Sequence, residues 1–212
     1  MINEAVKFII DNYTQYHKAV TTHIIISITA ILISVIIAIP IGVLCSKSTK
    51  ILYPLLNFFN FLRIIPSLAI LVLVLPILGT GFVPALVALV ILGIPPMLTN
   101  TYLGFKNIDK SVIESASGMG MNSKGMLFKI QFPLALPLII TGIRISAVEI
   151  IASATLASYI GAGGLGDFIF TGLSMNDYVM LFVGGASVAL LSVFSEIILL
   201  VFQQGITKYQ RD

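Results

Sequence analysis

The sequence predicts an all-α membrane protein in which residues 1–212 form a single transmembrane domain with about five spans. The first observation is composition, because 58% of the residues are hydrophobic and only 10% are charged, against about 25% charged residues in an average soluble domain. The second is a series of charge-free stretches long enough for helices of about 20 residues to cross a bilayer. The third is that lysines, glycines and prolines interrupt or bound these stretches. A soluble domain, a disordered chain, a disulfide scaffold and a nucleic-acid binder are excluded.

The spans follow from the charge-free stretches. The first predicted span contains no charged residue from Ile24 to Ser46, and it ends at Lys47. The second is expected to bend around Arg63–Pro66, and the turn residues Gly79–Gly81 separate it from the third. We expect the five spans at about 20–46, 51–78 (broken), 82–104, 134–160 and 178–204.

The lysines and arginines orient these spans. Lys7 and Lys18 lie on one side, and Arg63 and Arg144 lie within spans. Five crossings place the other eight of the twelve basic residues on the opposite side: Lys47, Lys50, Lys106, Lys110, Lys124, Lys129, Lys208 and Arg211. The positive-inside rule therefore predicts an outside N-terminus and a cytoplasmic C-terminus. If residues 51–78 instead formed two spans, giving six in total, the basic residues would be distributed over both sides of the membrane. Five spans are therefore favoured.

The polar loop at 105–133 predicts a helix-turn-helix in the cytoplasm. Lys110–Gly118 is compatible with a helix, Gly118 and Gly120 allow a reversal, and Asn122 or Ser123 can cap a second helix. We expect Pro133 and Pro137 to end that second helix and start the next span. Such an element either docks a partner protein or rests on lipid headgroups, and its residues alone leave both options open.

Several motifs carry a resemblance to a known family. Glu114-Ser115-Ala116 followed by Gly120 resembles the Glu-Ala-Ala loop of ABC-transporter permeases, with Ser115 in place of the first alanine. The family's Ile-x-Leu-Pro ending aligns with Ile130 and Leu136-Pro137 or, a few residues earlier, with Phe132-Pro133. The permeases of glycine betaine, carnitine and choline importers resemble this chain over further segments, namely Ile65–Ala69, Asn100–Tyr102, Lys106–Asp109 and Thr155–Gly166.

This resemblance implies a type I ABC importer permease fold, similar to a methionine permease, in the bacterial cytoplasmic membrane. It implies a second permease chain (identical or paralogous), two ATP-binding subunits, and an extracellular or lipid-anchored substrate-binding protein. The transported solutes would be osmoprotectants. The ATPase-coupling residues carried over by the motif are Glu114, Ser115, Ala116, Gly118, Gly120 and Met121. ATP and Mg would be bound by the partner, because this chain has no Walker motif and so cannot itself hydrolyse ATP.

Small and polar residues on the fourth span suggest a pathway. Ser146, Glu149 and Ser153 lie on one helix face. They either line a polar pathway or belong to small-residue packing, with a glutamate paired to Arg63 or Arg144. Glu196, on a similar stripe of the last span, favours the packing interpretation.

Other residues are candidates for a gate or hinges. A Gly-rich turn is expected at Gly161–Gly166, whose sequence fits the GxGxxG pattern of dinucleotide-binding sites. It lacks the preceding strand and the following acidic residue that such a site requires. It is expected to be a tight turn, either alone or as part of an external gate. The gate and hinge candidates are Pro66, Pro95, Pro96, Gly161, Gly163, Gly164 and Gly166.

No enzymatic or metal site is expected. His17 and His23 are the only histidines and lack paired ligands for a metal, and Cys45 is alone. Two rival functions remain at this point. One is an ABC permease for another small solute, such as methionine, and the other is a self-sufficient channel or secondary transporter built as a dimer.

Overall fold

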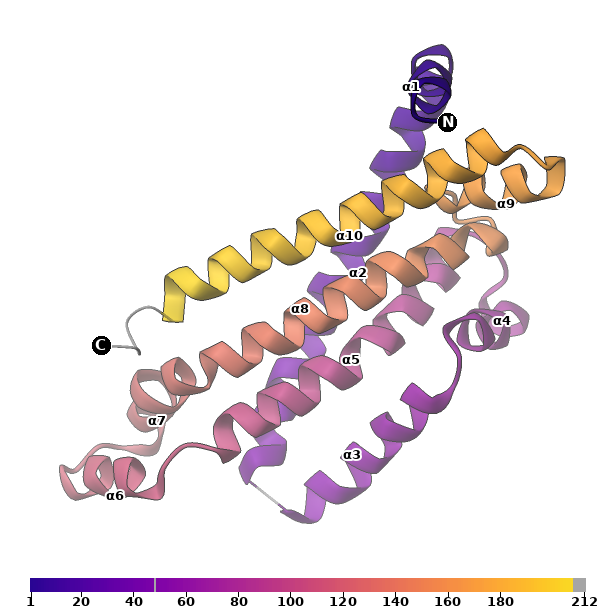
Figure 1. Cartoon of the computed structure of the whole chain (residues 1–212). Coiled ribbons are helices and arrows are strands. Elements are labelled where there is room, and N and C mark those ends of the chain that lie inside the picture. Colours follow the sequence, from indigo (N-terminus) through magenta and orange to yellow (C-terminus); the bar gives the residue numbers. More distant parts are fainter. Residues whose placement is uncertain (48, 208–212) are drawn as a thin grey trace.

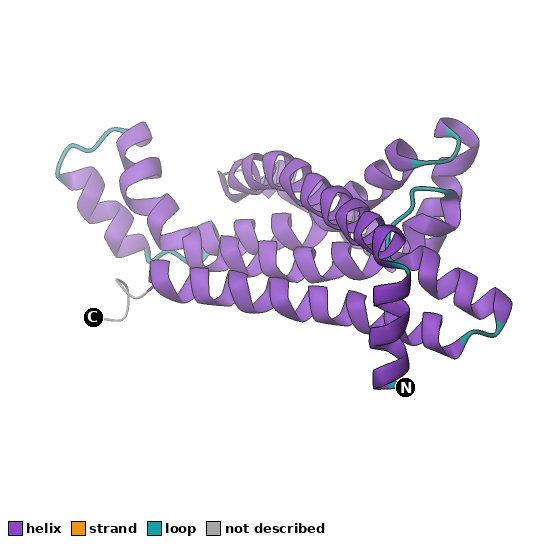
Figure 2. Ribbon diagram, turned by 90° about the horizontal axis from the view of Figure 1, so that it is seen from above, coloured by secondary structure: helices purple, strands orange, loops and turns teal. Residues whose placement is uncertain are grey.

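The structure, a computed structural model, describes the backbone of residues 1–47 and 49–207 and their side chains except those of 49–53, 56, 60, 63 and 207. Within these residues the chain is helical and has no strand (Figures 1 and 2). The α-helices are α1 (Ile2–Asp11), α2 (Tyr13–Lys47), α3 (Thr49–Ile64), α4 (Ser67–Leu78), α5 (Phe82–Lys106), α6 (Lys110–Gly118), α7 (Ser123–Met126), α8 (Phe132–Ala157), α9 (Gly166–Met175) and α10 (Tyr178–Thr207).

In the part of the chain that the structure describes, four helical segments are long and apolar enough to cross a membrane, namely α2, α5, the segment from Ser123 to Ile160, and α10. Residues 51–78 form α3 and the short apolar helix α4, which are separated at Ile65–Pro66. Pro66 is the N-cap of α4, with φ −55° and ψ 140°. The extended ψ of Pro66 separates the two helices, whereas the number of membrane crossings stays a prediction.

Helix α5 lies at the centre of the bundle and packs mainly on α2 and α8. A β-carbon added to Gly142 of α8 would lie 2.8 Å from Asn100 Cβ of α5, so the two backbones approach closely. The Ser146 hydroxyl of α8 donates a hydrogen bond to the Gly93 carbonyl of α5 at 2.7 Å. Small residues and interhelical hydrogen bonds of this kind hold membrane helices together, since lipid is as apolar as leucine.

The expected helix end at Pro133 and Pro137 is wrong, whereas the expected place of Pro133 in the first turn of the next helix, α8, is confirmed. A π-helical turn, Leu127–Gln131, joins α7 directly to α8, and both prolines lie within the continuous helix. The Phe132 N–H donates to the Leu127 carbonyl, five residues earlier. The wider turn lets the helix continue into Pro133, whose missing N–H group would break a regular α-helical ladder.

The two ends of the bundle carry different elements (Figure 1). Helices α6 and α7 lie at one end, whereas α1 and α9 lie at the other. At this second end α9 and α10 form a tight hairpin. The Asp177 carboxylate accepts hydrogen bonds from the N–H groups of Val179 and Met180, both at 3.0 Å, and so caps α10.

Candidate functional site

Helix α6 presents the Glu114 segment at one end of the bundle, with the predicted bounds Lys110–Gly118. Asp109 caps it, because its carboxylate accepts a hydrogen bond from the Ser111 N–H at 2.9 Å. Hydrogen bonds from Ser111, chiefly that of its backbone N–H, hold the pKa of the Asp109 carboxyl below its usual value. Glu114 and Ser115 are exposed, whereas Ala116 is buried. Helix α6 therefore packs against the protein through the small Ala116 side chain, whereas Glu114 faces outward.

The turn after α6 accounts for the glycine at position 120, six residues after Glu114. The Gly120 N–H donates to the Ser117 carbonyl at 2.9 Å, and the Met121 N–H donates to the Ala116 carbonyl at 3.1 Å. This pair of bonds is a Schellman motif, which requires a left-handed residue directly after the C-cap. Gly120 supplies it with φ +79°. The predicted reversal is confirmed, and Gly118, which is exposed, is the last residue of the helix.

The second helix of the loop is tied to the bundle. Asn122 caps α7 by accepting a hydrogen bond from the Gly125 N–H at 2.7 Å, which confirms one of the two expected caps. The Phe132 ring packs edge-on against Phe105 of α5, with centroids 6.4 Å apart. Met119 is 78% exposed. The loop thus combines an anchored base with an exposed helix and an exposed methionine, a geometry suited to receiving a partner protein.

The candidate pathway residues on α8 lie in different surroundings. Ser146 and Ser153 are buried, and Ser146 bonds to α5, as described above. Glu149 is half-buried. At Ser146 the geometry is that of helix packing, one of the two predicted alternatives. A pathway role for the three residues stays a prediction.

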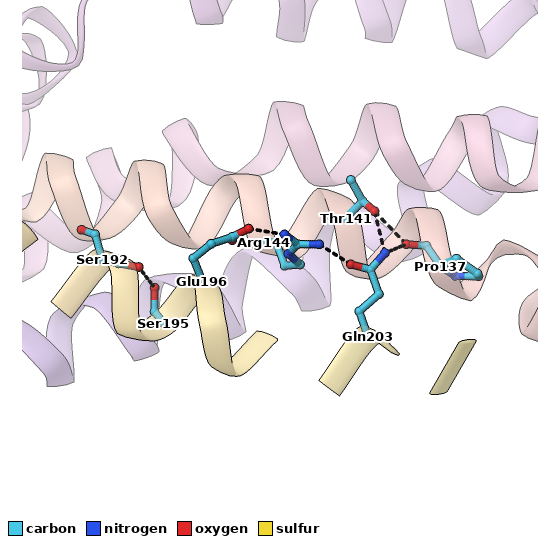
Figure 3. Close-up of polar contacts among 7 residues, drawn as sticks. All are labelled: Pro137, Thr141, Arg144, Ser192, Ser195, Glu196 and Gln203. Carbon is cyan, nitrogen blue, oxygen red and sulfur yellow. Dashed lines mark hydrogen bonds and ion pairs between the residues drawn. The ribbon is translucent and has the colours of Figure 1, made fainter. Parts of the chain in front are cut away.

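A polar cluster joins α8 to α10 (Figure 3). The Arg144 guanidinium forms an ion pair with Glu196 and donates a hydrogen bond to the Gln203 side-chain carbonyl. The Gln203 amide donates to the Pro137 carbonyl at 3.0 Å and to the Thr141 hydroxyl at 2.9 Å. The predicted pairing of a glutamate with Arg144 is thus found at Glu196. The side chain of Arg63, the other candidate partner, lies outside the described residues.

Gln203 was not singled out in the sequence. A signal was nevertheless available, because Gln203 lies seven residues after Glu196 and so on the same face of α10. Two polar residues at that spacing on an apolar helix can face the same neighbouring helix. Here that partner is Arg144.

The Gly-rich segment forms the turn between α8 and α9. Gly161, Gly163 and Gly164 have φ values of 81°, 76° and 105°, so the tight turn with positive φ is confirmed. Gly166 begins α9, and a β-carbon there would lie 2.0 Å from the Thr155 carbonyl oxygen. The backbone angles of this turn and the close approach of α9 to α8 therefore account for the glycines. Its role as a gate stays a prediction.

The proline hinge candidates lie in two places. Pro66 separates α3 from α4, whereas Pro95 and Pro96 are buried inside α5. Helix α5 continues through both of them from Phe82 to Lys106. Their role as hinges also stays a prediction.

His23 has a structural role. It is fully buried on α2, and its Nε2 donates a hydrogen bond to the Ile151 carbonyl of α8 at 3.0 Å, since a carbonyl can only accept. Among the described residues, no three His, Cys, Asp or Glu side chains are grouped so that they could hold a metal ion. His23 is thus a link between two helices.

Comparison with known proteins identifies the family. The family model described as "Binding-protein-dependent transport system inner membrane component" matches residues 38–208. The carnitine transport permease protein OpuCB of Listeria monocytogenes is 42% identical over 82% of this chain and 80% of its own length. The glycine betaine/carnitine/choline transport system permease protein OpuCB of Bacillus subtilis is 37% identical over 97% and 95%.

A solved structure shows the same fold. The matched chain of the MetNI methionine ABC transporter, in an inward-facing conformation, superposes with a TM-score of 0.84 over 92% of this chain and 97% of its own. At 19% identity this similarity concerns the fold alone, and it confirms the predicted type I importer permease fold. The family match covers most of the chain, and the two relatives cover 82% and 97% of it. The chain therefore belongs to the inner membrane components of binding-protein-dependent transport systems.

Proposed function

We propose that this chain is the permease subunit of an ATP-driven importer for quaternary ammonium osmoprotectants, with glycine betaine, carnitine and choline as its solutes. The observation that carries the proposal is the identity to permeases named for these solutes over most of both chains. The fold and the exposed Glu114 helix agree with a subunit that translocates solute and receives force from a partner.

The proposed assembly contains two permease chains, identical or paralogous, and two ATP-binding subunits. An extracellular or lipid-anchored protein delivers the solute. ATP and Mg belong to the ATP-binding subunits. The basic residues that the sequence concentrates on one side orient α6 toward the cytoplasm, where these subunits reside. Because α6 ends in a Schellman turn and α7 continues into α8, a push on α6 is transmitted to a spanning helix.

The test is uptake of labelled glycine betaine, carnitine, choline and methionine in cells that lack their own osmolyte importers. The chain is expressed with its partner ATPase and binding protein. We expect uptake of quaternary ammonium solutes that stops on ATP depletion. The double variant Glu114→Ala with Gly120→Trp is expected to reduce uptake to background, because it removes the exposed carboxylate and the left-handed turn.

The matched control is Asp11→Ala, which removes another exposed carboxylate on α1, at the opposite end of the bundle. It is expected to leave uptake unchanged. Uptake of methionine alone would keep the coupling mechanism and overturn the solute class. Uptake that is indifferent to ATP and to the double variant would instead indicate a self-sufficient carrier.

A further inference from the structure

A cavity of about 550 Å³ lies between the N-terminal part of α2, the Gly-rich turn and α9. Helix α2 contributes Lys18 and Thr22, and α9 contributes Asp167 and Thr171. Gly163, which adopts a positive φ of 76° in the Gly-rich turn, also lines the cavity. The volume is within the range of roughly 300–1,000 Å³ typical of small-molecule sites.

The length of α2 places this cavity outside the hydrocarbon. At 35 residues α2 is about 52 Å long, whereas the hydrocarbon core measures about 30 Å. The charge-free stretch from Ile24 to Ser46 is long enough to fill that core. Lys18 and Thr22 come before it and therefore lie at the membrane surface, on the side of the N-terminus. Solutes dissolved in water can reach the cavity there.

Two opposite charges line the cavity without meeting. Among the described residues, neither Lys18 nor Asp167 has an ion pair or a side-chain hydrogen bond. Desolvation by the surrounding cavity wall raises the pKa of the exposed Asp167 carboxyl above its usual value, so its ionised form lacks full hydration. The cavity thus offers an ammonium group and a carboxylate that both remain available to a ligand.

We propose that this cavity is a transient receiving site for the zwitterionic solute, in which Lys18 binds the solute's carboxylate and Asp167 attracts its quaternary ammonium group. The inference rests on the proposed function for the identity of the solute. It adds a site, an orientation and a basis for discrimination between zwitterionic and purely cationic solutes.

The residues that line the cavity are suited to brief rather than tight binding of the solute. A quaternary ammonium group has no N–H to donate, so tight sites surround it with several aromatic faces. Here the lining contributes one ring, Phe168, which is itself buried against Phe8 and Tyr16. A single carboxylate with one aromatic neighbour attracts the cation and lets it leave, as transfer to a pathway requires.

The first test exploits a difference between the solutes. Glycine betaine and carnitine carry a carboxylate, whereas choline does not. We expect Lys18→Met to lower the initial uptake of betaine and carnitine by about tenfold, the loss of one charge-assisted contact, and to leave choline uptake unchanged. Asp167→Asn is expected to lower uptake of all three. The matched controls Lys7→Met and Asp11→Asn lie on α1, do not line the cavity, and should match the wild type.

The outcomes separate this site from the proposed function. Wild-type uptake of betaine with unchanged rates in both Lys18→Met and Asp167→Asn would overturn the site and keep the function. An equal fall of all three solutes in Lys18→Met would also overturn it, because that pattern indicates contact with the delivering protein. A wild-type complex that imports none of the three would overturn the function itself.

A second test needs no transport. Thr171→Cys places a thiol on the cavity wall, and Ser174→Cys places one on the same helix but outside the cavity. In the purified complex without binding protein, millimolar betaine is expected to slow modification of the first thiol by a cationic methanethiosulfonate reagent. It should not slow modification of the second. Native Cys45 is buried and serves as the background. Equal rates with and without betaine at Thr171→Cys would refute the site.

Discussion

Gly166→Ala should destabilise the junction between α8 and α9 strongly, although Gly166 has no unusual backbone angle. A β-carbon there would lie 2.0 Å from the Thr155 carbonyl oxygen and 2.3 Å from the Ser158 hydroxyl oxygen. Carbon and oxygen atoms in ordinary contact are about 3.3 Å apart, so the backbones must separate by roughly 1.3 Å. The Thr155 carbonyl and Gly166 itself both belong to helical backbone, so neither can move aside as a flexible side chain could.

The expected cost is about 3 kcal/mol, the upper end of the usual range for overpacking. For a chain of this length that corresponds to a fall in Tm of roughly 6–12 °C. The assay is thermal unfolding of the purified complex in detergent, followed by size-exclusion chromatography of the fluorescently tagged permease. It compares the variant with the wild type at equal lipid and detergent content.

The matched control is Gly185→Ala on α10, where no heavy atom lies within 4 Å of the added β-carbon. Because alanine favours a helix over glycine by about 1 kcal/mol, this change should leave Tm unchanged or raise it slightly. The two variants make the same chemical change and differ only in the space around it. If Gly166→Ala unfolded within 2 °C of the control (roughly 1 kcal/mol), the close approach at the α8–α9 junction would be refuted.

Two further predictions concern the polar contacts. Glu196→Ala should lower stability by about 1–3 kcal/mol, because it leaves the Arg144 charge partly buried without its partner. Adding Arg144→Met should cost less than the sum of the single changes, and strict additivity in a double-mutant cycle of Tm would contradict the pairing. Asp109→Ala should speed hydrogen exchange at the Ser111 amide, whereas Asp109→Asn, which keeps a neutral acceptor, should speed it less. Because the folded pKa of Asp109 is lowered, the protection at Ser111 should be full above about pH 4 and should fall to the level of Asp109→Asn as the pH falls through that lowered value. Protection that stayed constant into strong acid would count against the cap.

The local features of this chain follow from its sequence because their causes are local. Charge-free stretches predict apolar helices, and the structure has such helices at α2, α5, α8 and α10. Gly118 and Gly120 predict the reversal at the end of α6, since a left-handed turn depends on a few neighbouring residues. The same local reasoning was wrong at Pro133, where a π-helical turn carries the helix past the proline.

The tertiary structure decided which distant residues meet. The sequence allowed a glutamate to pair with Arg63 or Arg144, and only the crossing of α8 and α10 pairs Glu196 with Arg144 and brings Gln203 beside them. Likewise, no pattern in the sequence places Lys18 and Asp167 around one cavity, because they are brought together by the return of the chain from α8 through the Gly-rich turn. The sequence by itself determined the class of protein, its long apolar helices and its exposed loop, since hydropathy and capping act along the chain. The partners and the cavity depend on how the helices cross, which is set by packing across the whole bundle.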